Sequence, residues 1–183
     1  MVAKIYISAK ERDDDLLNPI VQRIHEIYED PKITELKLIL TGVAAFNNDS
    51  ALTLNYILTQ EKPEHLTITV NSYCTMALPE LAIVCAGDRR WVRPDAKIRM
   101  AVKYPSKYFS GEPDDAQKEK AEEYRESPGF MDQELLLDFA NQWLEVKTLA
   151  NQFFTGRDLA KWGVLSGVGL DAELEALGST FKN

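Results

Sequence analysis

Hydrophobic and polar residues alternate most clearly in the middle of the chain. Leu66–Val70 alternates β-branched and apolar residues, which predicts a strand. Cys74–Ala86 is an apolar run that Gly87 closes, which is typical of a buried helix with a glycine cap. Short apolar segments at Arg90–Val92 and Lys97–Val102 predict two more strands, joined by a proline turn.

The amino-terminal part begins with a strand and a helix. Lys4–Ser8 alternates and predicts an edge or early strand. The acidic run Asp13–Asp15 predicts an N-cap for a helix that starts near Leu16, with Pro19 in its first turn and Pro31 closing it. Apolar residues then recur at three- and four-residue spacings, which predicts one stripe packed on a sheet: Leu17, Ile20, Val21, Ile24, Ile27 and Tyr28.

A second strand and helix follow. Leu36–Thr41 is apolar at nearly every position, as expected for a parallel strand covered on both faces. The cluster Asn47–Asp49 predicts the N-cap of a helix whose apolar residues are Leu52, Leu54, Ile57 and Leu58. Strands that alternate with helices predict an α/β fold with a mostly parallel sheet.

The carboxy-terminal third has a different character. Gly111–Arg125 is highly charged, which predicts a helical or partly mobile segment with little to bury, and Ser127–Gly129 is expected to break it. An amphipathic helix is predicted over Asp132–Asn151.

Composition narrows the possible functions. A chain of 183 residues is most simply one domain, and its net charge of −8 argues against nucleic-acid or anionic-membrane partners. Cys74 and Cys85 fall in the apolar helix and are expected to be buried free thiols, which favours a cytoplasmic location. The first apolar segment is too short for a signal peptide. No ligand spacing predicts a metal, and no phosphate loop or dinucleotide motif predicts a cofactor.

These elements, in this order, resemble the proteolytic subunit of the Clp protease, ClpP, within the ClpP/crotonase superfamily. The resemblance implies a spiral of β-β-α units with a mostly parallel sheet and a C-terminal helical extension, over a single domain 1–183. Residues 1–105 and 153–166 match best, and 106–152 diverges where ClpP has its handle helix. The resemblance rests on these segments: Ser72–Ala77, Ala86–Gly87, Arg90–Trp91, Pro94–Lys97, Ile98–Val102 and Phe153–Leu165. The last segment resembles the superfamily's closing signature, which implies a short helix that ends in an aromatic, a glycine and an aliphatic residue.

The resemblance places the family's functional positions on residues of a different kind. The nucleophile position falls on Thr75 and the base position on Ala101. The glycines that supply oxyanion N–H groups correspond to Ala45 and Phe46. The position that corresponds by residue count to the family's triad aspartate holds Lys147, which is not acidic. No catalytic residue is therefore assigned. Ser166 takes the place of an aspartate that commonly follows the closing motif.

The residues themselves favour structural roles over chemistry. Thr75 is expected to be a helix N-cap, and Cys74 a buried thiol. A triad needs a base near its nucleophile, and neither His25 nor His65 is well placed. Lys103 is a base only if burial lowers its pKa.

Three functions remain open. The first is a ClpP-like homo-oligomer with a degenerate site that acts as a scaffold or binds protein or peptide partners. The second is a serine-, threonine- or cysteine-type peptidase with relocated catalytic groups. The third is a crotonase-like acyl-CoA binding protein, which the lack of an obvious basic patch for the CoA phosphates disfavours.

Overall fold

The computed structural model describes residues 1–8, 13–41, 46–99, 115, 118–119, 122–123, 128–141 and 152–166. Its main sheet has four parallel strands in the order β1-β2-β3-β4. They are β1 (Val2–Ser8), β2 (Glu35–Thr41), β3 (Thr67–Ser72) and β4 (Arg89–Val92). The predicted mixed α/β fold with a parallel sheet is therefore confirmed.

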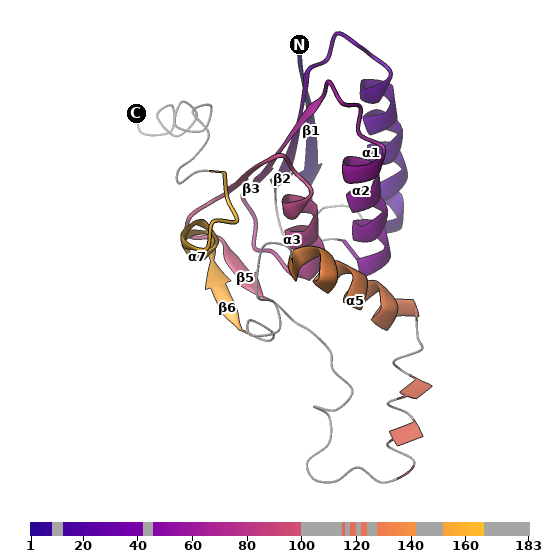
Figure 1. Cartoon of the computed structure of the whole chain (residues 1–183), viewed down its shortest axis with the longest axis vertical. Coiled ribbons are helices and arrows are strands. Elements are labelled where there is room, and N and C mark those ends of the chain that lie inside the picture. The colour runs from indigo at the N-terminus through magenta and orange to yellow at the C-terminus, as the bar shows by residue number, and fades with distance from the viewer. Residues whose placement is uncertain are drawn as a thin grey trace.

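Three helices connect the strands and lie on one side of the sheet (Figure 1). They are α1 (Asp13–Tyr28), α2 (Asn48–Gln60) and α3 (Leu78–Cys85). Adjacent strands align Leu36 with Ile68 and Leu38 with Val70, and all four side chains are buried. The core forms between these apolar residues and the helices, because parallel strands need a cover for their apolar side chains.

Most predicted elements occur, with shifted ends. The helix expected from Leu16 begins at Asp13, because acidic residues are favourable within a first turn as well as before it. Pro19 consequently lies in the second turn of α1, which corrects its predicted place in the first turn. The helix ends at Tyr28, before Pro31 as predicted.

A second, two-stranded sheet lies beside the main one. β5 (Lys97–Arg99) pairs antiparallel with β6 (Phe153–Thr155), and Met76 joins β5 through two backbone hydrogen bonds. The short helix α7 (Gly156–Lys161) follows β6, and Trp162 is its C-cap, just before Gly163 at a φ of 75°. The predicted short helix with an aromatic-glycine end is confirmed, since a positive φ is what favours glycine there.

Helix α5 (Pro128–Asn141) packs against α2 and α3. It begins earlier than the predicted Asp132, since Pro128 and Gly129 belong to its first turn instead of forming a break. Its predicted continuation over 142–151 lies outside the described residues. In the charged segment, Asp115, Lys118, Glu119, Glu122 and Glu123 are helical and exposed.

Within the described part of the chain, no helix has the length and apolar character needed to cross a membrane.

The first prediction concerns Gly156, where β6 turns into α7. A Cβ built there would collide with the carbonyl group of Arg93, so Gly156→Ala must displace backbone. We expect a loss of about 1–3 kcal/mol in the free energy of unfolding, measured by denaturant titration. At Gly163 a Cβ would meet nothing, so Gly163→Ala should cost only about 1 kcal/mol for its positive φ. Equal losses in the two variants would contradict a tight contact at Gly156.

Candidate functional site

The turn after β3 carries the residues that sequence analysis singled out. The N–H of Tyr73 still donates to the carbonyl of Leu40 in β2, at 3.0 Å. Cys74 is buried, with its Sγ 3.3 Å from Ser72 Oγ, whereas the next residue, Thr75, is exposed. The expected buried thiol at Cys74 is confirmed.

Thr75 is not the N-cap of the following helix. The backbone at Met76 is extended, donating to the Lys97 carbonyl and accepting from the Arg99 N–H, both at 2.9 Å. The N-cap of α3 is Ala77, two residues further on. The predicted cap was therefore wrong, because pairing with β5 keeps this stretch extended and delays the helix.

Glu80 supplies the cap that Ala77 has no side chain to make. Its side chain is 2% exposed, and its Oε2 accepts the N–H of Ala77 at 3.0 Å. Its Oε1 accepts the N–H of Phe46 at 3.1 Å, across 34 residues of sequence. The two oxygens of one buried carboxylate thus join the start of α3 to the connection between β2 and α2.

Phe46 is the one oxyanion-loop position that lies within the described residues. Its side chain is buried, and its N–H points at Glu80. Beside it, Asn47 caps α2 by accepting the Ser50 N–H at 2.8 Å, as the Asn47–Asp49 cluster predicted. Ala45, Ala101, Lys103 and Lys147 lie outside the described residues.

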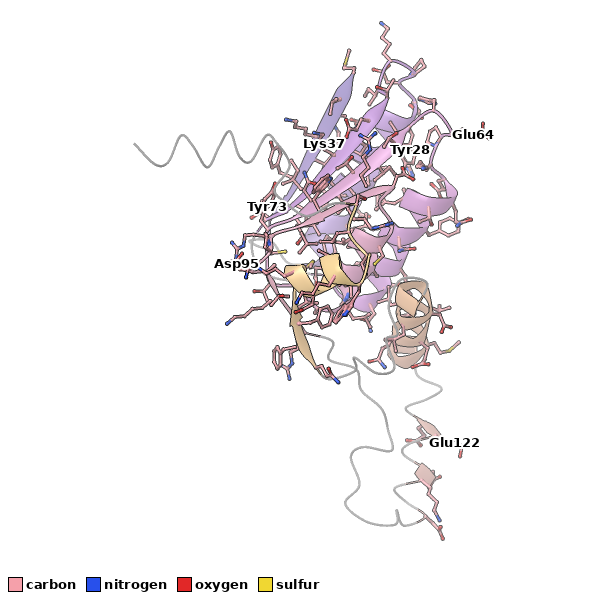
Figure 2. All side chains as sticks on the ribbon, turned by 60° about the vertical axis from the view of Figure 1, so that its left-hand side comes forward. Tyr28, Lys37, Glu64, Tyr73, Asp95 and Glu122 are labelled. Carbon is pink, nitrogen blue, oxygen red and sulfur yellow. The ribbon has the colours of Figure 1, made fainter. Side chains whose placement is uncertain are left out.

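Neither histidine is near Thr75. His65 precedes β3 and Thr75 follows it, so a strand of six residues, roughly 20 Å, separates them. His25 is half exposed on α1, 3.1 Å from Glu61. Figure 2 shows Tyr73 and Asp95 on one side of the molecule, and Tyr28 and Glu64, neighbours of the two histidines, on the other.

Burial makes both thiols weak nucleophiles. Burial raises the pKa of the Cys74 thiol, and its hydrogen bond with Ser72 acts in the opposite direction. Burial also raises the pKa of Cys85, to about 12. Because the thiolate is the reactive form, neither cysteine is activated. Among the described residues, no group of three His, Cys, Asp or Glu side chains could hold a metal ion.

Ser166, which the resemblance placed at an aspartate position, has a structural role. Its hydroxyl oxygen accepts the Arg90 N–H at 2.9 Å, and its own N–H donates to the Arg90 carbonyl at 3.0 Å. The guanidinium of Arg90 also donates to the Val164 carbonyl. These bonds fasten the segment after α7 to the edge strand β4.

The sequence matches no family model and no curated protein.

The role of Glu80, which accepts the N–H groups of Ala77 and Phe46, was not predicted from the sequence. The signal was present, since a proline followed by glutamate is typical of the first turn of a helix, with the glutamate reaching back to the N-cap. Read that way, Pro79 and Glu80 would have placed the N-cap at Ala77. The bond to Phe46 had no such signal, because it depends on the tertiary fold.

The second prediction tests Glu80. In Glu80→Gln the amide can accept only one of the two N–H groups and turns its own NH₂ toward the other. We expect the free energy of unfolding to fall by about 1–3 kcal/mol, because a buried N–H is left without an acceptor. Glu64→Gln is the matched control, since Glu64 is exposed, and it should change stability little. A Glu80→Gln variant as stable as wild type would contradict the bridging role.

The third prediction concerns the thiols. With a pKa of about 12, Cys85 has a thiolate fraction roughly a thousandfold below that of an ordinary thiol near neutral pH. We expect a thiol-reactive chromogenic disulfide at about pH 8 to label the native protein very slowly and the denatured protein at both cysteines. Raising the pH should speed labelling, because it raises the thiolate fraction. Rapid stoichiometric labelling of native Cys74 would reveal an activated nucleophile.

Proposed function

We propose that this chain is a ClpP-like protein with a degenerate active site, which works as a non-catalytic scaffold or partner-binding subunit within a homo-oligomer. The observation that carries the proposal is the Glu80 carboxylate on the N–H groups of Phe46 and Ala77. In an acyl-transfer enzyme of this type, backbone N–H groups at this place would hold the developing oxyanion. Here the Phe46 position already binds a negative charge that belongs to the protein.

Charge repulsion disfavours a second anion at the N–H groups that the Glu80 carboxylate already accepts. A second anion at the same N–H groups would lie about 4 Å from the carboxylate, a repulsion of about 4 kcal/mol at an effective dielectric constant of about 20. Loss of one oxyanion donor alone lowers a rate by roughly 10²–10³. The neutral thioester oxygen of an acyl-CoA would find the Phe46 N–H already donating to Glu80, which counts against the crotonase-like alternative.

The nucleophile and base are also poorly supported. Thr75 is exposed, and both histidines lie far from it. Cys74 is buried as a neutral thiol beside Ser72. The arrangement around the sheet, with strand, extended turn, capped helix and strand in succession, supports the ClpP-like spiral as the scaffold that remains.

The fourth prediction is that the purified chain has no ClpP-type peptidase activity. We expect no turnover of fluorogenic peptides above background, and no change in that background in Thr75→Ala. Intact-mass analysis after a serine- or cysteine-reactive acylating inhibitor should show no stoichiometric adduct, since neither described histidine is positioned as a base to activate Thr75 or Cys74.

Two outcomes would overturn the proposal. Turnover that disappears in Thr75→Ala, or an adduct mapped to Thr75 or Cys74, would establish the relocated-peptidase alternative. A rise in melting temperature with an acyl-CoA, absent with free CoA, would establish the acyl-CoA alternative instead.

A further inference from the structure

The ribbon of β5 and β6 has two unlike faces. Ile98 and Phe154, which are register partners, are 0% and 6% exposed and point into the core. Arg99 pairs with Phe153, and Lys97 lies two residues before Arg99, so these three side chains share the opposite face. All three are exposed, Phe153 to 71%. We call Lys97, Arg99 and Phe153 the ribbon face.

The ribbon face lies in the most basic part of an acidic chain. Residues 88–99 and 152–166 contain seven Lys or Arg and three Asp, a net charge of +4 in a chain of −8. The remaining residues therefore carry −12. The exposed cation Arg157 lies just beyond β6, next to the ribbon face in sequence.

Nearby carboxylates do not neutralise these cations. Asp95 is paired with Arg93 at 2.6 Å, and one oxygen of Asp158 accepts both the N–H and the hydroxyl of Thr155 at 2.8 Å. Within the described residues, no ion pair reaches Lys97, Arg99 or Arg157. The ribbon face thus offers positive charge that its described surroundings leave uncompensated.

Charge and aromatic surface meet at one point of this face. The guanidinium carbon of Arg99 lies 5.5 Å from the centre of the Phe153 ring. Such stacking leaves the guanidinium edge free to bind a carboxylate in a bidentate manner while it holds the side chain in one orientation. The rest of the exposed ring is available to an apolar side chain.

Backbone pairing and side-chain packing hold the β5–β6 ribbon in place. Met76 pairs with one edge of β5, and Phe154 packs against Trp162 with ring centres 5.3 Å apart. Gly156 lies against the Arg93 carbonyl at the end of β6. Figure 1 shows the ribbon on the side of the molecule away from α1 and α2. A fixed, preorganised surface loses less entropy when it binds a partner.

We propose that the ribbon face binds an acidic peptide segment of a partner protein. Carboxylates of the peptide pair with Arg99 and Lys97, and an apolar side chain of the peptide packs on Phe153. This inference deepens the proposed function and rests on it, since it gives the partner-binding role a surface and a partner chemistry.

The same observations disfavour single-stranded nucleic acid as the occupant. Single-stranded nucleic acid binds through rows of aromatic side chains in a long basic groove. Phe153 is the one aromatic residue among the three that form the ribbon face, and the −12 carried elsewhere repels a long polyanion. A second copy of the chain also has exposed acidic residues, and the oligomeric state of the variants described below tests that occupant.

The fifth prediction is tested with a short fluorescein-labelled peptide of Asp and Glu around one central Phe. The control peptide replaces each carboxylate by its amide. We expect fluorescence anisotropy to show saturable binding of the acidic peptide to the full chain, and at least tenfold weaker binding of the amide peptide. Raising salt from about 0.05 M to about 0.5 M should weaken binding severalfold, because the screening length falls to a few ångströms.

Variants locate the site. Arg99→Gln and Phe153→Ala should each weaken peptide binding about tenfold, since they remove the cation and the ring that share the face. Arg23→Gln is the matched control, an exposed arginine on α1 that pairs with Glu26, and it should leave binding unchanged. Circular dichroism and the melting temperature check that each variant folds.

Two results of the peptide assay would overturn the inference: equal affinity for both peptides, or an equal loss of affinity in Arg23→Gln and Arg99→Gln. Tighter binding of a single-stranded oligonucleotide than of the acidic peptide would also overturn it. So would an Arg99→Gln variant that changes only the oligomeric state and not peptide affinity. Peptide turnover would contradict the proposed function alone, because binding is measured separately on the intact labelled peptide.

Discussion

The arrangement around the end of the main sheet depends on one carboxylate. Glu80 accepts N–H groups from Phe46 and Ala77, so it closes the connection that follows β2 against the first turn of α3. Without Glu80 the buried N–H of Phe46 and the part-buried N–H of Ala77 would lack this acceptor, at a cost comparable to the hydrogen bonds themselves. Glu80 therefore caps α3 directly at Ala77 and binds the residue just before Asn47, which caps α2 with its own side chain.

The Glu80 carboxylate lies near the carboxyl ends of β2 and β3. In open α/β sheets, ligands bind beyond the carboxyl ends of the strands, where helix N-termini and loop amides converge. The chain leaves β2 toward Phe46 and β3 toward Thr75, so the fold gathers anion-binding groups at the usual place. The sequence then fills that place with its own anion.

Local patterns were enough to predict β1 to β5 and α1 to α3, because their apolar spacing, caps and turn residues act within a few positions. The cap cluster at Asn47 is an example. The short helix α7 and its glycine step after Trp162 were instead expected from the family resemblance. The error at Thr75 had a non-local cause, since Met76 pairs with β5 more than twenty residues away and keeps the backbone extended. The Phe46 to Glu80 bond and the pairing of β5 with β6 join segments that no short pattern connects.

The two places where this chain could meet a ligand carry opposite charge, negative at the strand ends and positive at the ribbon. At the strand ends a buried carboxylate removes the electropositive character that chemistry on an acyl group requires. At the ribbon, exposed cations surround an exposed ring, while the carboxylates beside them are held by Arg93 and Thr155. Under our proposal the ribbon recognises an anionic partner, and selective binding of this kind requires charge complementarity and no catalytic group.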